Sequence, residues 1–351
     1  MSSTATIADL TGDAVLYRDL EPCDPALPRI AALRAKLGMA DGPLPRKRDR
    51  AYAQLILALA HAAQAVRGGP PLTCVAVIGD TDNDRLLAIH LDELGALAAY
   101  GFIGEDRPVA PETMEWQGKV ALATRWHLLD AWAATLETQG CDWSRTALLI
   151  DIDKTLLGPR GRSDGAIDDA RAEGALAVAA TLAGPGLDVA AFRRTYAELC
   201  HRQWHSFTLD NQDYVVATAL LAVAGALDLE QLATQVAAGP PPRFAETLAA
   251  TAPVVPPWLA DLHADLRERV ASGDPTPFKA FRRAELTATL ARMADGRLTL
   301  CDVVLELGQR LAARGALCLA ASDKPAESAL PSPEQQAVGM RPLHRMPAII
   351  G

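Results

Sequence analysis

The sequence comprises 351 residues, half of them hydrophobic, and it carries a formal net charge of −9 at pH 7. The hydrophobic content excludes a chain that is disordered throughout, and the negative charge argues against a general binder of nucleic acids or anionic membranes. The cysteines form no CxxC pair, the N-terminus carries no secretion signal, and no apolar run approaches membrane-spanning length. We therefore expect a reduced, cytoplasmic protein with no nucleic-acid partner and no membrane contact.

The first part of the chain alternates helical and strand patterns. In chain order we predict an irregular segment at 1–27, helices near 28–38 and 48–67, a buried strand at Thr73–Asp80, a helix from Arg85, an apolar run at Ala98–Ile103 and a helix near 121–138. A Gly-Gly-Pro-Pro sequence separates the second helix from the strand and is typical of a turn or loop that ends a helix.

The second part contains a long helical block between two further strands. We predict a buried strand at Thr146–Asp151, helices from about 165 to 299, a helix near 301–314, a strand at Gly315–Ser322 and an irregular tail from Pro325. This order favours an α/β fold with a Rossmann-like parallel sheet and a large helical insertion. We expect residues 28–160 and 300–351 to form the core and residues 161–299 to form the insertion.

Polar residues of matched chemistry follow three of the predicted strands. They are Asp80 with Asp84 in IGDTDND, Asp151 with Asp153 in IDIDKT, and Ser322 with Lys324 in ASDKP. Open parallel sheets place functional groups just past the carboxyl ends of their strands, so these residues are expected to meet. Clustered carboxylates need a cation, and oxygen ligands of this kind suit Mg²⁺. A hydroxyl and an ammonium group would supply what a phosphate needs.

These residues carry a family resemblance. IDIDKT resembles the hhhDxDxT motif of the haloacid dehalogenase-like (HAD) superfamily, AASDKP resembles its second motif, and VIGDTDND resembles its fourth. The third motif is a Lys or Arg at the start of a helix, for which LPRKRDRAYAQLILAL offers Lys47, with Arg46 and Arg48 as competitors. The family order is first to fourth, whereas this chain runs third, fourth, first, second. The resemblance therefore implies a circularly permuted HAD core. Such a permutation requires little structural change, because domain termini tend to lie close together.

The resemblance implies catalytic and metal-binding roles for the acidic residues. Asp151 would be the nucleophile that forms an aspartyl-phosphate, and Asp153 would be the general acid and base. Mg²⁺ would be held by Asp151, the backbone carbonyl of Asp153 and Asp80. Asp84 belongs to the same metal site, where it would orient a metal-bound water or Lys47.

The remaining motif residues would bind the phosphoryl group. Lys47 and Ser322 would contact its oxygens, and Thr155 is assigned to substrate binding with them. Lys324 could replace Lys47 as the phosphate-side cation. The helical insertion occupies the position of a cap, which in this family would exclude water and select the substrate.

These patterns predict a Mg²⁺-dependent phosphatase that acts on a small phosphorylated metabolite. The alternatives are phosphoryl transfer to another acceptor, dehalogenation, and a non-catalytic binding or scaffold protein on the same core. Each motif taken alone could also be an ordinary turn or helix start. His201 and His205 are one helical turn apart, but no third zinc ligand accompanies them. His344 and Arg345 are unexplained by these motifs.

Overall fold

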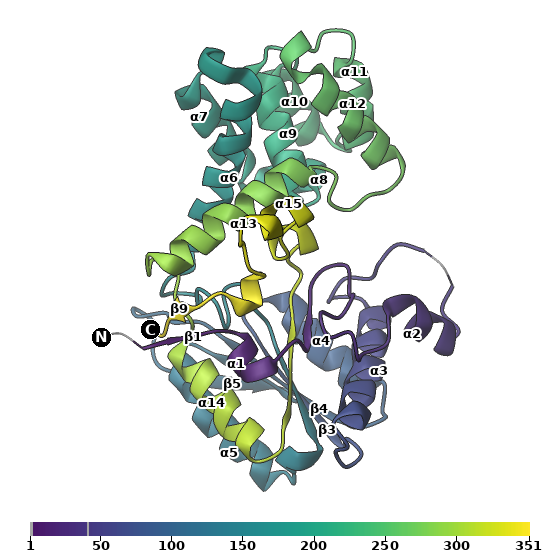
Figure 1. Cartoon of the computed structure of the whole chain (residues 1–351), viewed down its shortest axis with the longest axis vertical. Coiled ribbons are helices and arrows are strands. Elements are labelled where there is room, and N and C mark those ends of the chain that lie inside the picture. The colour runs from purple at the N-terminus through teal and green to yellow at the C-terminus, as the bar shows by residue number, and fades with distance from the viewer. Residues whose placement is uncertain (1–2, 41) are drawn as a thin grey trace. The chain divides into compact units, whose positions relative to one another are not determined.

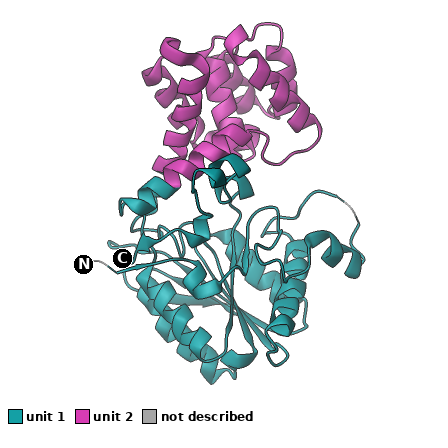
Figure 2. Ribbon diagram, in the orientation of Figure 1, with its two compact units in different colours: residues 1–168, 290–351 teal, residues 169–289 magenta. Residues whose placement is uncertain are grey.

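The structure is a computed structural model that describes residues 3–40 and 42–351. The chain forms two compact units, one made of residues 1–168 and 290–351 and the other of residues 169–289 (Figure 2). The first contains the sheet and is called the α/β unit below, and the second is called the helical unit. The helical unit lies within the expected insertion at 161–299, and the outer residues of that range belong to the α/β unit.

The α/β unit is built on a mostly parallel sheet of seven strands. The strands of the chain are β1 (Thr4–Ala5), β2 (Val15–Leu16), β3 (Cys74–Gly79), β4 (Ala98–Gly104), β5 (Met114–Gln117), β6 (Val120–Ala123), β7 (Thr146–Ile150), β8 (Leu317–Ala321) and β9 (Ala348–Ile349). The strand order is β2-β8-β7-β3-β4-β6-β5, and only the β5–β6 pair is antiparallel. β1 and β9 form a separate antiparallel pair. The expected α/β class with a parallel sheet is therefore confirmed.

Helices cover both faces of this sheet (Figure 1). The helices of this unit include α1 (Ala8–Thr11), α2 (Ile30–Lys36), α3 (Arg50–Val66), α4 (Asp82–Glu93), α5 (Leu129–Thr138), α14 (Asp302–Ala313) and α15 (Pro333–Ala337). α3 and α4 lie on one side of the sheet, and α5 and α14 lie on the other (Figure 1). Across the described residues, no helix has both the length and the apolar character that crossing a membrane requires.

The packing explains why the central strands are apolar throughout. Val75, Val77 and Leu149 point to the face covered by α3 and α4, where they pack in one core with residues such as Leu59 and Leu87. Successive side chains of a strand point to opposite faces, so the residues between them face the helices on the other side. Every residue of β3, β7 and β8 is buried. Burial on both faces produces continuous apolar runs, and a carboxylate becomes possible only where each strand ends.

The helical unit is formed by α6 to α13. Their bounds are α6 (Gly165–Ala183), α7 (Val189–Leu199), α8 (His205–Thr208), α9 (Gln212–Val223), α10 (Leu229–Ala238), α11 (Phe244–Thr251), α12 (Pro257–Ala271) and α13 (Lys279–Ala294). The first residues of α6 and the last residues of α13 belong to the α/β unit. The unit has a hydrophobic core of its own, in which Phe192, Trp204, Phe207, Phe278 and Phe281 are buried.

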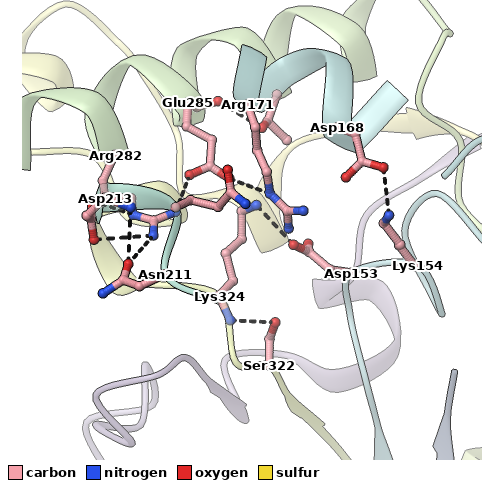
Figure 3. Close-up of polar contacts among 12 residues, drawn as sticks. Asp153, Lys154, Asp168, Arg171, Asn211, Asp213, Arg282, Glu285, Ser322 and Lys324 are labelled. Carbon is pink, nitrogen blue, oxygen red and sulfur yellow. Dashed lines mark hydrogen bonds and ion pairs between the residues drawn. The ribbon is translucent and has the colours of Figure 1, made fainter. Parts of the chain in front are cut away.

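A buried ion-pair network crosses the core of the helical unit (Figure 3). The Arg282 guanidinium donates hydrogen bonds to Oδ1 of Asp213 at 3.0 Å and to Oε2 of Glu285 at 2.9 Å. Burial lowers the pKa of Arg282, but the two carboxylates raise it above its ordinary value. The network therefore joins α13 to the start of α9 through three buried side chains of opposite formal charge.

Three stretches differ from the sequence-based expectations. Residues 1–27, expected to be irregular, contain β1, α1 and β2, and β2 pairs with β8 at the edge of the sheet. Residues 120–123, expected to begin a helix, form β6, and α5 begins only at Leu129. The tail from Pro325 contains α15 and β9. Strands of two to four residues are too short to show a period, so their partners in the sheet decide their conformation.

Candidate active site

The carboxyl ends of β3, β7 and β8 lie level with one another at one edge of the sheet. Ile150 of β7 is paired with Ile78 of β3 on one side and with Ala320 of β8 on the other. The first polar residue after each strand, Asp80, Asp151 or Ser322, lies one or two positions beyond this row. The three strand ends identified in the sequence are therefore neighbours, at the edge where open parallel sheets bind ligands.

Three aspartates form a compact acidic cluster at this edge. Asp80, Asp84 and Asp151 each place one carboxylate oxygen within 4.8 Å of the others. The exposed fractions of these side chains are 2%, 3% and 9%. A side chain at Gly79 would displace one of them, because a Cβ atom there would lie 2.3 Å from the carboxylate carbon of Asp84. The glycine of the GD sequence therefore makes room for the cluster.

Lys47 places a buried positive charge inside the acidic cluster. Its side chain is 3% exposed, and its Nζ donates hydrogen bonds to Oδ1 of Asp84 at 2.8 Å and to Oδ1 of Asp151. Burial lowers the pKa of Lys47, but the attraction of Asp151 and Asp84 outweighs burial and holds the pKa well above its ordinary value. Lys47 is therefore a permanent cation whose two partners are both in the cluster.

Lys47 does not neutralise the whole cluster. Burial raises the pKa of Asp151 well above its ordinary value, and although Lys47 lowers this pKa, Asp84 and Asp80 raise it further. Burial also raises the pKa of Asp80 to about 6, against the opposing attraction of Arg160. A further cation would remove this repulsion. The donor set consists of carboxylate oxygens alone and therefore fits a small, hard divalent ion such as Mg²⁺.

Asp84 is held by α4 as well as by Lys47. It lies in the first turn of that helix, where its Oδ2 accepts hydrogen bonds from the backbone N–H of Thr81 at 3.2 Å and from the Thr81 hydroxyl at 2.7 Å. Both oxygens of Asp84 therefore have protein donors. Of the two partners expected for Asp84, a metal-bound water or Lys47, the structure shows the contact with Lys47.

Asp80 has two partners on the loop that follows β7. Its Oδ2 accepts hydrogen bonds from Nε of Arg160 at 2.6 Å and contacts Nη2 of Arg160 at 2.5 Å. Its Oδ1 accepts a longer hydrogen bond, 3.3 Å, from the Thr155 hydroxyl. The Thr155 hydroxyl, for which we expect a contact with the substrate, thus also has a carboxylate partner. Arg160 was not predicted, because nothing in LLGPRGR distinguishes it from Arg162.

The second half of the site joins β7 to β8 (Figure 3). Nζ of Lys324 donates a hydrogen bond to Oδ2 of Asp153 at 3.1 Å, and the backbone N–H of Lys324 donates to Oγ of Ser322 at 3.1 Å. Ser322 and Lys324 are both buried. The two candidate phosphate-side cations thus contact different carboxylates: Lys47 contacts Asp151, and Lys324 contacts Asp153.

The other candidate cations have different partners. The backbone N–H of Arg46 binds the side chain of Asp49, which precedes α3, and the exposed Arg48 accepts a hydrogen bond from His90 on its carbonyl oxygen. Of the three consecutive basic residues, Lys47 is the one whose side chain the structure brings to Asp151.

The histidines that the sequence singled out lie outside the acidic cluster. His201 and His205 are paired with Glu198 and Asp210, and within the described part of the chain neither belongs to a group of three potential metal ligands. His344 is buried, accepts a hydrogen bond from Tyr17 or donates one to it, and contacts an aspartate near the N-terminus, which Arg345 also binds. His344 and Arg345 therefore link the segment that follows β8 to the segment that precedes β2.

Comparisons of the chain with protein-family models, with curated proteins and with solved structures find no match. The function must therefore be argued from the geometry and chemistry of the site.

Proposed function

We propose that this protein is a Mg²⁺-dependent phosphatase that hydrolyses a small phosphorylated metabolite through an aspartyl-phosphate on Asp151. One observation carries the proposal: Asp151 directly follows a central strand and lies in one buried cluster with the cation of Lys47 and two further carboxylates. A buried acidic cluster is unfavourable for stability, so its presence favours a chemical role. The resemblance to the HAD motifs names the reaction to which such a cluster is suited.

The metal ion would be held by Asp80 and Asp151, with the backbone carbonyl of Asp153 as a further ligand and Asp84 in the same cluster. When bound, Mg²⁺ would offset the negative charge that the nucleophile and the phosphate bring together. Asp84 has both oxygens committed to Lys47 and Thr81, so its part is to position Lys47.

In this mechanism each residue has one task. Asp151 attacks the phosphorus atom through one carboxylate oxygen and would bind the metal ion through the other, while Lys47 holds the carboxylate by its Oδ1. Asp153 gives a proton to the leaving oxygen and recovers one from the water that hydrolyses the aspartyl-phosphate. Lys324 orients Asp153 through the hydrogen bond to its Oδ2. Lys47 and Ser322 stabilise the charge that develops on the phosphoryl oxygens.

The proposal includes a circular permutation of the HAD motif order. Two contacts support it: β1 pairs with β9, and both residues of the His344–Arg345 pair bind Asp13. The segments that precede the third motif and follow the second are therefore adjacent in the α/β unit. In a circular permutation, a short covalent link between two such segments is lost and a new pair of chain ends takes its place. The role of the helical unit in selecting the substrate stays a prediction.

Among the alternatives, dehalogenation is disfavoured by the acidic cluster. A metal-free displacement of halide has no use for the carboxylates of Asp80 and Asp84. A non-catalytic binding protein is disfavoured for the same reason, because a core without catalytic demand gains nothing from buried, mutually repelling aspartates.

The test compares Asp151→Asn with Asp82→Asn in hydrolysis of p-nitrophenyl phosphate at millimolar Mg²⁺. Asp82 is in the same GDTDND sequence, but its side chain is 70% exposed and pairs with Arg85. We expect Asp151→Asn to abolish turnover, Asp82→Asn to retain it, and both to fold, as judged by circular dichroism. Wild-type turnover by Asp151→Asn would refute the mechanism. A melting temperature that does not respond to Mg²⁺ or EDTA would favour the binding protein.

A further inference from the structure

Arg160 divides the two oxygens of Asp80 between the protein and a potential metal ion. The guanidinium takes Oδ2 through two nitrogens, at 2.6 and 2.5 Å. Among the described residues, Oδ1 receives a single hydrogen bond, at 3.3 Å from the Thr155 hydroxyl. A carboxylate has about four lone-pair positions, two on each oxygen. Oδ2 is therefore filled by its two donors, whereas Oδ1 keeps a lone pair.

The backbone of Arg160 is held in place by tertiary hydrogen bonds. Its N–H donates to the carbonyl of Lys154 at 2.8 Å, and its carbonyl accepts from the Asp106 N–H at 3.0 Å and from Nε1 of the buried Trp126 at 3.1 Å. The next residue, Gly161, has φ +84°, and a Cβ atom there would lie 2.0 Å from the carbonyl oxygen of Asp106. The loop can therefore approach Asp106 only with glycine at this position, and this approach fixes where the Arg160 side chain begins.

The other carboxylates of the cluster also have protein donors. Oδ1 of Asp151 is bound by Lys47, Oδ1 of Asp84 is bound by Lys47, and Oδ2 of Asp84 has two donors from Thr81. Coordination of a metal ion by both oxygens of one carboxylate is therefore blocked at Asp80, where Arg160 fills Oδ2, and at Asp84, where Thr81 fills Oδ2. At Asp151 it is opposed by the charge of Lys47 beside Oδ1.

This restriction affects Ca²⁺ and Mg²⁺ differently, although the two ions carry the same charge. Ca²⁺ takes six to eight oxygen ligands in flexible geometry and commonly binds both oxygens of a carboxylate. Mg²⁺ requires six ligands in octahedral geometry and keeps several waters, so it needs only one oxygen from each carboxylate. We propose that Arg160 makes the site selective for Mg²⁺ over Ca²⁺ by occupying one oxygen of Asp80 and leaving the other for the metal. This inference rests on the metal site of the proposed function.

The ratio of the two affinities tests the proposal, because the charge of Arg160 weakens the binding of both ions alike. The Arg160→Lys variant keeps the positive charge but removes the planar guanidinium that binds one carboxylate oxygen through two nitrogens, because the lysine ammonium is a compact point charge. Arg162→Lys is the matched control: it lies on the same loop, but its guanidinium binds Asp106 and Asp302. Mg²⁺ and Ca²⁺ are titrated separately into the metal-free full chain by calorimetry, without substrate.

We expect Arg160→Lys to shift the ratio of the Mg²⁺ and Ca²⁺ dissociation constants by about tenfold toward Ca²⁺, which corresponds to about 1.4 kcal/mol. Arg162→Lys should leave the ratio unchanged. Arg160→Gln, a second variant, should bind both ions more tightly and show the same shift in ratio. An unchanged ratio in both Arg160 variants, or an equal shift in Arg162→Lys, would overturn the proposal. The metal site itself fails separately, if the wild type binds neither ion or if Asp80→Asn binds Mg²⁺ as the wild type does.

Discussion

The Lys47→Met substitution tests the electrostatic balance of the acidic cluster. Methionine keeps most of the volume of the side chain and removes its charge. Lys47, Asp84 and Asp151 have side-chain exposed fractions of 3%, 3% and 9%, so solvent screens their interaction very little. Removing one partner of a buried ion pair costs about 3–5 kcal/mol, because the other charge is left buried without compensation. For a domain of this size, 1 kcal/mol corresponds to about 2–4 °C in Tm, so we expect a loss of roughly 6–20 °C.

The double variant Lys47→Met/Asp151→Asn separates charge from packing. Once Asp151 is neutral, the charge that Lys47 offsets is smaller, so the double variant should be more stable than Lys47→Met alone. Residues in one ion-pair network typically show interaction energies of about 0.5–3 kcal/mol. The burial that raises the pKa of Asp151 also predicts that Asp151→Asn alone costs little stability. Loss of stability in the double variant should therefore be smaller than the sum of the losses in the single variants.

The assay is differential scanning calorimetry of the full chain in EDTA, with urea unfolding to obtain free energies. Arg48→Met is the matched control, because Arg48 is adjacent in the sequence and exposed. It should change the free energy of unfolding by no more than about 0.5 kcal/mol. If Lys47→Met melted within about 2 °C of the wild type, or if the single losses were additive, the charge of Lys47 would not be what stabilises the cluster.

Two further predictions concern buried charges elsewhere. Burial lowers the pKa of His344, although its hydrogen bond to Asp13 partly opposes this shift. A histidine whose pKa is lowered by folding stabilises the fold at pH values above its unfolded pKa of about 6.5, and this contribution is lost as the pH falls through its folded pKa. The Tm of the wild type should therefore drop more between pH 7.5 and 5 than the Tm of His344→Gln. An equal drop in Tm for the two proteins would contradict this reasoning. In the helical unit, Arg282→Met removes the buried cation that Asp213 and Glu285 share and should cost about 3–5 kcal/mol in urea unfolding, whereas Arg283→Met, at an exposed position, should be nearly neutral.

The strand ends could be predicted from the sequence because their signal is local. A strand buried on both faces is read as an apolar run, and the first carboxylate after it marks the edge of the sheet. Asp80 and Asp151 satisfy this rule directly. That the three strands are neighbours was an inference from the matched chemistry of their ends, and the register of Ile150 with Ile78 and Ala320 confirms it.

The cations were harder to predict, because their assignment depends on tertiary geometry. Arg46, Lys47 and Arg48 are equivalent by charge, and only the direction of the turn before α3 selects Lys47 for the cluster. The contact of Arg160 with Asp80 depends on hydrogen bonds from Asp106 to a loop far from it in the sequence. No local sequence pattern indicates such long-range contacts, and a basic residue in a loop is usually solvated.

The proposed permutation of the motif order is compatible with a single buried cluster. Lys47 and Asp84 precede Asp151 in the chain, yet their side chains meet it inside one buried cluster. Such a cluster needs the strands to be adjacent in the sheet, and adjacency in a parallel sheet does not depend on the order in which strands occur along the chain. What a permuted order does require is that the segments on either side of the altered connection stay together. The β1–β9 pair and the contact of His344 with Asp13 meet that requirement. An acid-sensitive His344 would therefore act on the stability of the α/β unit from the side of the proposed permuted connection, without touching the acidic cluster itself.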